Sequence, residues 1–60
     1  MLRGDKVKFT EYAKEKGLVR SHEIGTVTAV YLAQDKTEVI WPDGSKFIYP
    51  NICLEATADK

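Results

Sequence analysis

The sequence has few cysteines and no long apolar run, the features that allow disulfide bonds, secretion signals and membrane spans. It contains a single cysteine, Cys53, so no disulfide can form within the chain. Its opening residues lack the apolar segment of a secretion signal, and its longest apolar run, residues 29–33, is far shorter than the ~20 residues of a membrane span. These absences favour a cytoplasmic protein in a reducing environment, stabilised by its core or by an oligomer interface.

The residue sets that metal binding and catalysis require are also missing. One histidine, His22, and one cysteine cannot supply a tetrahedral zinc site within one chain. The four glycines are scattered, which excludes a glycine-rich phosphate loop. We therefore expect no catalytic residue, no metal and no cofactor. His22 is expected to be a solvated loop residue and Cys53 a small buried hydrophobe.

The chain has no net charge, but its charges are unevenly distributed. Residues 1–22 carry six lysines and arginines against three acidic side chains, and residues 23–60 carry the reverse. A basic first third can face phosphate. The overall neutrality removes the general attraction that drives non-specific binding to nucleic acid.

What the sequence does contain is a series of short β-strand patterns within a single domain of 60 residues. The ordered core is expected at about 2–56, with a frayed tail at 57–60. Alternating, β-branched or aromatic residues predict strands at 5–10, 25–32, 37–41, 45–49 and 54–56. Leu2 is expected to tuck under the sheet. Val27 and Val30 can both face inward only if a bulge or bend interrupts the strand near Ala29.

Two connecting segments carry further predictions. Thr10 and Gly17 could bound a helical turn after the first strand, but so short a helix needs tertiary support. We therefore interpret residues 11–23 as a long loop in which Leu18 or Val19 packs inward. Residues 33–36 are expected to form a turn, and residues 50–53 a single 3₁₀ turn, since proline cannot donate to a strand ladder.

Residues 42–44 (PDG) give the strongest local signal in the sequence. Proline presets φ, aspartate favours the turn, and Gly44 accepts the positive φ of a three-residue hairpin loop. This loop predicts a register that sets Trp41 opposite Ser45 and Val39 opposite Phe47. The expected core then comprises Val7, Phe9, Val27, Val39, Trp41 and Phe47.

Five short strands without a long helix predict an all-β fold, a small five-stranded barrel. Three groups of residues are spaced in a way that resembles small SH3-like barrels: 4–9 (GDKVKF), 25–27 (GTV), and 41–45 (WPDGS) leading to Tyr49-Pro50 and Leu54-Glu55. These barrels include KOW-type and Tudor-like modules and short phage or mobile-element proteins. The resemblance covers about residues 4–55 and implies a fold rather than one activity.

Residues 44–50 (GSKFIYP), followed by Leu54-Glu55, also resemble the active-site strand of the plasmid-borne type II dihydrofolate reductases. That family forms SH3-like tetramers around a central pore. Its isoleucine–tyrosine pair is kept as Ile48 and Tyr49, but Phe47 stands where the family has a ligand-binding glutamine. The family also has a lysine that attracts the cofactor phosphate, and the resemblance places Phe9 or Thr10 at the position of that lysine. The resemblance implies an oligomer, and the two departures argue against reductase activity.

Two surfaces are candidates for binding. The first combines basic side chains with tyrosines that could stack on bases; it comprises Lys6, Lys8, Tyr12, Lys14, Lys16, Arg20, Tyr31 and Tyr49. The second is the outer face of the hairpin, where Ile40 and Ile48 suggest a covering subunit or partner.

These surfaces leave three functions open. The favoured one is a non-enzymatic binding module that contacts nucleic acid or a nucleoprotein complex. The others are a protein-interaction or oligomeric structural module and a type II reductase-like tetramer.

Overall fold

A computed structural model describes residues 2–18 and 24–57 of the chain. The elements follow one another as β1 (Lys6–Phe9), α1 (Glu11–Glu15), β2 (Gly25–Tyr31), η1 (Leu32–Gln34), β3 (Lys36–Ile40), β4 (Lys46–Pro50), η2 (Asn51–Cys53) and β5 (Leu54–Ala56). The two η elements are single 3₁₀ turns. The five predicted strands and the 3₁₀ turn before the last strand are therefore confirmed. The expected turn at 33–36 is formed mainly by η1, and Lys36 already belongs to β3.

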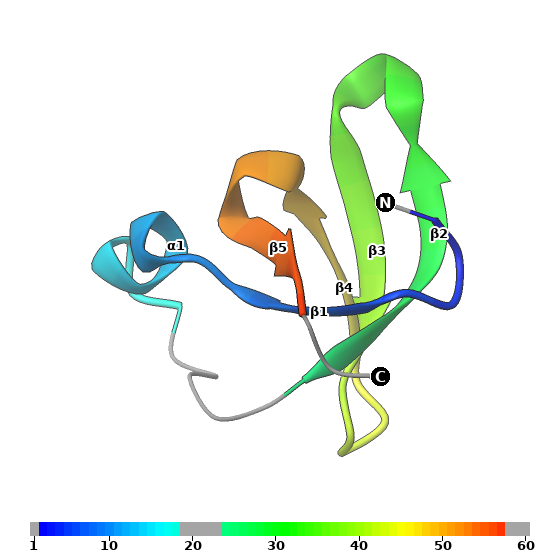
Figure 1. The fold of residues 1–60 in the computed structure, drawn as a ribbon, viewed down its shortest axis with the longest axis horizontal. Coiled ribbons are helices and arrows are strands. Elements are labelled where there is room, and N and C mark those ends of the chain that lie inside the picture. The colour runs from blue at the N-terminus through cyan, green and yellow to red at the C-terminus, as the bar shows by residue number, and fades with distance from the viewer. Residues whose placement is uncertain (1, 19–23, 58–60) are drawn as a thin grey trace.

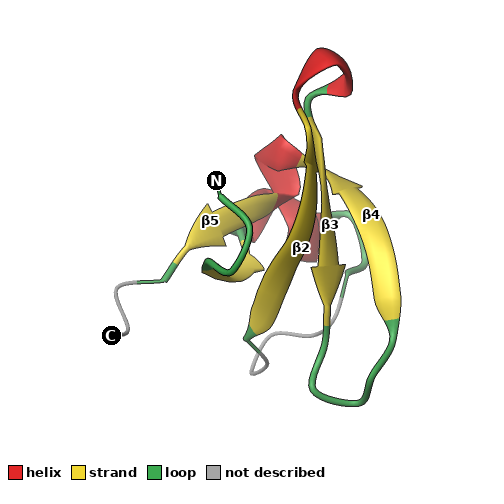
Figure 2. Ribbon diagram, turned by 90° about the vertical axis from the view of Figure 1, so that its right-hand side faces the viewer, coloured by secondary structure: helices red, strands yellow, loops and turns green. Residues whose placement is uncertain are grey.

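The strands form one antiparallel sheet in the order β4-β3-β2-β1-β5. In Figure 1, β1 runs across β2 and β3, and β5 lies beside β3 where it pairs with β1, so the sheet is strongly curved. Figure 2 shows β2, β3 and β4 side by side, with β5 on the other side of the fold. No pairing between β4 and β5 closes the sheet in the part of the chain that the structure describes. The fold is thus mostly β, with β4 and β5 as the two sheet edges.

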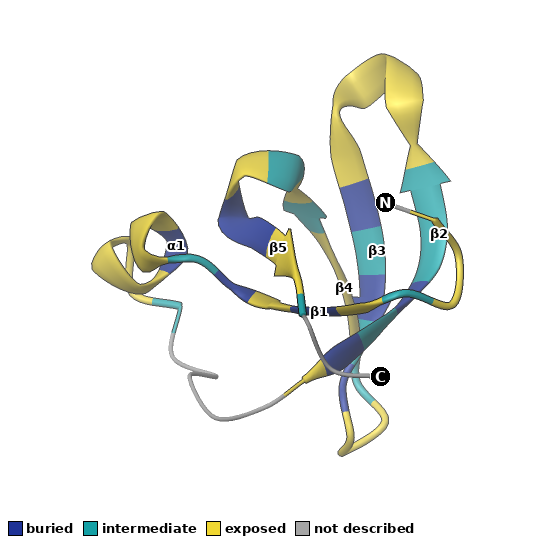
Figure 3. Ribbon diagram, viewed as in Figure 1, coloured by how far each residue is buried: buried dark blue, intermediate teal, exposed yellow. Residues whose placement is uncertain are grey.

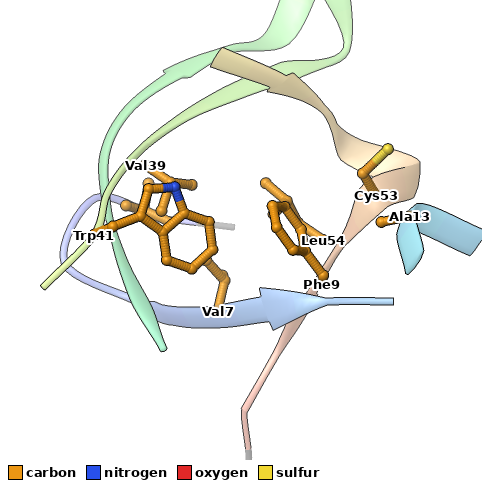
Figure 4. Packing of buried hydrophobic residues seen from close by; sticks show 8 residues of the cluster. Val7, Phe9, Ala13, Val39, Trp41, Cys53 and Leu54 are labelled. Carbon is orange, nitrogen blue, oxygen red and sulfur yellow. The ribbon is translucent and has the colours of Figure 1, made fainter. Parts of the chain in front are cut away.

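The core lies between the two arms of the curved sheet. Val7 and Phe9 alternate with exposed lysines along β1, and their side chains meet Val39 and Trp41 from the β3 side (Figures 3 and 4). The rings of Phe9 and Trp41 are 5.0 Å apart between centroids. Ala13 of α1 and Cys53 of η2 extend the cluster toward the helix. Buried Cys53 confirms the prediction of a small core residue.

A β-bulge in β2 reconciles two apolar residues that strict alternation would place on opposite faces. Val27 pairs with Val39 and Ala29 with Glu38, so the register shifts between Val27 and Ala29. Val27 is buried, and Val30 is half-buried against the same cluster. The predicted irregularity near Ala29 is therefore confirmed.

The β3–β4 hairpin has the predicted turn and register. The Gly44 N–H donates to the Trp41 carbonyl oxygen, the Trp41 N–H donates to the Ser45 carbonyl oxygen, both at 2.8 Å, and Gly44 has φ +91°. Val39 lies opposite Phe47. The proline, aspartate and glycine of this turn thus specify the hairpin locally.

The segment after β1 differs from the expected loop, because residues 11–15 form α1. The Thr10 hydroxyl oxygen accepts from the Ala13 N–H at 3.3 Å, and Gly17 takes a positive φ of 93° after the helix. Tertiary contacts supply the support that a five-residue helix needs: Ala13 is buried, and Thr10 donates its hydroxyl to the Ile52 carbonyl oxygen. Leu18 packs against the core as predicted, whereas Val19 lies outside the described residues.

Two residues that were expected inside are exposed. Leu2 is 73% exposed, since the chain turns sharply at Gly4 before β1 begins. Phe47 shares a sheet face with buried Val39 but is 51% exposed. The physical reason is position: β4 is an edge strand, so Phe47 has a neighbouring strand on one side only. The prediction of Phe47 as a core residue was wrong.

A polar cluster joins η2 to the end of the β2–β3 hairpin. The buried Thr37 hydroxyl donates to Asn51 Oδ1 at 2.6 Å, and Asn51 Nδ2 donates to Asp35 Oδ1 at 3.0 Å. The Asn51 N–H also donates to the Asp35 carbonyl oxygen at 3.0 Å. At the other end of the domain, the Thr57 N–H donates to the Lys6 carbonyl oxygen at 3.0 Å.

Candidate interaction surfaces

The lysines of β1 lie on the exposed side of that strand. Lys6 donates its ammonium group to Thr26 Oγ1 on β2 at 2.8 Å. Lys8 lies opposite exposed Glu55 of β5 in the sheet register. Acidic Glu55 therefore lies directly beside one of the two cationic positions on this face.

Lys14 of α1 and Lys16, the residue that follows the helix, both have local partners. Lys14 Nζ lies 3.7 Å from Glu11 Oε2, in a pair that is largely solvent-exposed and so contributes little to stability. Lys16 Nζ lies 5.4 Å from the centroid of the Tyr12 ring, which is within the range of a cation–π contact. Tyr12 is 42% exposed, so its ring remains accessible beside this cation.

The other predicted binding residues do not join this group. Tyr31 is exposed as expected, but it is the last residue of β2. Figure 1 shows the end of that strand on the opposite side of the fold from α1. Tyr49 is half-buried, and its hydroxyl accepts from Trp41 Nε1 at 2.9 Å. Arg20 and His22 lie outside the described residues. The structure thus brings Tyr12, Lys14 and Lys16 together and leaves both other tyrosines elsewhere.

The hairpin surface contains both predicted isoleucines and one residue that was expected inside. Ile48 is 50% exposed on β4, and Ile40 on β3 is half-buried. Phe47, on the opposite face of β4 from Ile48, is equally exposed. Lys46 and Pro50 bound this apolar stretch. The edge position of β4 makes Phe47 accessible, and strand patterning alone does not reveal which strand lies at an edge.

The hydrogen-bond phase of the hairpin determines which backbone groups of β4 face outward. Trp41 bonds Ser45 at one end of the hairpin, and Asn51 bonds Asp35 at the other. Because hydrogen-bonded pairs alternate with non-bonded pairs in an antiparallel ladder, Phe47 and Tyr49 direct their N–H and C=O groups at β3. Lys46 and Ile48 direct theirs away from the sheet. Pro50 shares that outward phase, where a missing N–H breaks no bond to β3.

Metal sites and membrane-spanning helices were also sought in the described parts of the chain. No three His, Cys, Asp or Glu side chains gather there in an arrangement that could hold a metal ion. None of the helices among residues 2–18 and 24–57 has the length and apolar composition that a membrane span needs.

Comparison of the chain with protein-family models, with curated proteins and with solved structures found no match.

Proposed function

We propose that the protein is a non-enzymatic protein-contact module whose binding surface is the outer edge of β4. The observation that carries this proposal is the pair Phe47 and Ile48, each about half exposed on opposite faces of one edge strand. We define this edge surface as residues 46–50. Its two exposed apolar side chains flank backbone groups that face away from the sheet. An extended segment of a protein partner can satisfy both features by adding one strand.

The energetics favour an extended apolar partner over solvent. When a partner covers an exposed apolar side chain, the binding free energy becomes more favourable by about 25 cal/mol for every Å² of apolar surface removed from water. Edge strands with such side chains are normally guarded by charge, by proline or by a covering element. Here Lys46 and Pro50 guard only the two ends of the strand, and Phe47, Ile48 and Tyr49 lie between them.

We further propose that the curved sheet is an SH3-like barrel working in the cytoplasm. The strand order, with β1 between β2 and β5, supports this architecture, as does the 3₁₀ turn that leads from β4 into β5. The cytoplasmic setting is supported by the sequence alone, whose single cysteine gives the fold no internal disulfide of the kind that small secreted domains use.

The test uses the whole chain and a panel of random heptapeptides displayed on phage. Selection on the wild-type protein should enrich peptides with alternating apolar residues, and these should shift the amide resonances of Lys46 and Ile48. The double variant Phe47→Ser/Ile48→Thr should lose at least tenfold in peptide affinity, in both low and high salt. Leu32→Ser is the matched control, since Leu32 is 84% exposed but lies in η1. Peptide binding that the double variant retains would refute the proposal, as would a failure to enrich any peptide.

A second candidate function is nucleic-acid contact through α1 and β1. The cation of Lys16 over the exposed ring of Tyr12 favours it, because single-stranded bases stack on accessible aromatic rings beside cations. Lys6, Lys8 and Lys14 would then neutralise phosphates. Binding of a short DNA or RNA should weaken steeply with salt, and Lys14→Glu/Lys16→Glu should abolish it. Salt-independent amide shifts, or none, would exclude this function.

A further inference from the structure

The edge surface of residues 46–50 has a nearly symmetric arrangement about Ile48. Aromatic Phe47 and Tyr49 flank Ile48, and the guarding residues Lys46 and Pro50 lie one step further out. We propose, on the basis of the protein-contact function above, that the partner is a second copy of this chain. Its β4 strand pairs antiparallel with β4 of the first copy, around a two-fold axis at Ile48. Two five-stranded sheets thereby join into one.

The phase of the hydrogen bonds restricts this pairing to few registers. Only Lys46, Ile48 and Pro50 have backbone groups directed outward, so outward residues must lie opposite outward residues. One such register sets Ile48 opposite Ile48 of the second copy. The registers shifted by two residues set Ile48 opposite Lys46 or opposite Pro50, and each leaves one outward residue of β4 without a partner in β4 of the other copy. The first register is favoured because it pairs all three outward residues and sets isoleucine opposite isoleucine.

The favoured register provides both backbone hydrogen bonds and side-chain contacts between the two strands. Ile48 and its counterpart exchange both of their N–H···O bonds. Each Lys46 N–H donates to the Pro50 carbonyl oxygen of the other copy, so the missing proline N–H costs only one bond on each side. Phe47 lies directly opposite Tyr49 of the other copy, as a close non-hydrogen-bonded pair of aromatic rings. Lys46 and Pro50, which hinder the pairing of β4 with other strands, therefore permit its pairing with β4 of a second copy.

Charge and size predict the strength of the pairing. The chain has a formal net charge of zero, so two copies do not repel one another as whole molecules. A stable interface buries about 800 Å² on each partner, and one strand of five residues buries less. The dimer is therefore weak and depends on protein concentration.

Disulfide trapping tests the register directly. In a Cys53→Ala background, Ile48→Cys places two thiols on residues whose Cα atoms are about 5.5 Å apart in the dimer, within the range that a disulfide spans. The matched controls are Lys46→Cys and Phe47→Cys, whose Cα atoms would be about 14 Å and about 8 Å from their counterparts. Under mild oxidation, Ile48→Cys should give at least tenfold more cross-linked dimer than either control. A circular-dichroism spectrum of each variant checks that it folds.

A charge-swap measurement gives a second test without cysteine. Ile48→Lys and Ile48→Glu should each be monomeric by sedimentation at concentrations where the wild type associates. Their equimolar mixture should associate again, because the axis brings the opposite charges together. A mixture as monomeric as its components, with no preferential cross-linking at position 48, would overturn self-pairing. If selected heptapeptides still shift Lys46 and Ile48 in that case, the protein-contact function survives and only the identity of the partner is wrong. If they do not, both proposals fall.

Discussion

The indole Nε1 of Trp41 donates a 2.9 Å hydrogen bond to the hydroxyl oxygen of Tyr49, across the β3–β4 hairpin. The Tyr49 ring also meets Phe9 edge-on, with centroids 5.1 Å apart, and Phe9 in turn packs against Trp41. This triangle connects β1 with both sides of the hairpin. Tyr49 consequently acts mainly as a structural residue, whose hydroxyl oxygen already accepts a hydrogen bond from the core.

Tyr49→Phe should destabilise the fold by about 1 kcal/mol, because it removes one hydrogen-bond acceptor from Trp41 and leaves the ring packing in place. Urea denaturation followed by tryptophan fluorescence measures the effect. Tyr31→Phe is the control, since Tyr31 is partly exposed at the end of β2, and its free energy of unfolding should stay within about 0.5 kcal/mol of the wild type. Equal losses for both variants would contradict this role for Tyr49.

The hairpin could be predicted from the sequence because its determinants are local. Pro42, Asp43 and Gly44 specify the turn, and the turn specifies the register that sets Val39 opposite Phe47. The bulge near Ala29 followed from the need to bury both Val27 and Val30. In each case the information lies within a few residues of the feature that it determines.

The features that sequence reasoning missed depend on contacts between distant segments. Whether Phe47 is covered depends on which strand lies at the sheet edge, and nothing in residues 45–49 encodes that order. Helix α1 is too short to form by itself and persists because Ala13 and Thr10 meet η2, some forty positions later. For the same reason, Tyr49 was grouped with the exposed tyrosines although its hydroxyl bonds Trp41.

Gly25→Ala should be among the most damaging substitutions in the chain. A Cβ at this buried position would collide with Val39 Cγ1 and lie 3.1 Å from the Trp41 ring. Overpacking of this kind costs about 1–3 kcal/mol, a large share of the roughly 3–9 kcal/mol expected for a domain of 60 residues. Chemical denaturation measures the loss. The double variant Gly25→Ala/Val39→Ala should lose less than the sum of the single losses, since shortening Val39 removes the collision. Strict additivity would argue against the close approach.

Asn51→Ala should destabilise the protein by about 1–3 kcal/mol, because the fully buried Thr37 hydroxyl loses its hydrogen-bond acceptor. Thr37→Val removes that hydroxyl and keeps the side-chain shape. A double-mutant cycle in urea should show that Asn51→Ala costs less in the Thr37→Val background than in the wild type. Independent costs would mean that the 2.6 Å contact contributes nothing to stability.

Thr10→Ala should loosen α1 more than it weakens the sheet. The Thr10 side chain accepts from the Ala13 N–H and donates to the Ile52 carbonyl oxygen, so alanine removes both the helix cap and the link to η2. Loss of an N-cap costs about 0.5–2 kcal/mol. Amide hydrogen exchange should become faster in residues 13–17 than in β3. Thr10→Ser keeps the hydroxyl and should restore slow exchange, and a serine variant as fast as alanine would show that the methyl group, not the cap, matters.

The absence of reductase activity is the prediction that bears most directly on the resemblance to type II dihydrofolate reductases. That resemblance implies that Phe47 stands at the position of the family's ligand-binding glutamine, and a phenyl ring cannot donate or accept the hydrogen bonds of an amide. We expect the purified protein to oxidise NADPH no faster with dihydrofolate than without it, in a spectrophotometric assay at the protein concentrations used to test the proposed self-pairing. Phe47→Gln tests whether this one residue blocks activity. Oxidation by the wild type would contradict a non-enzymatic function, whereas oxidation by Phe47→Gln alone would show that the scaffold holds both ligands and lacks only the amide.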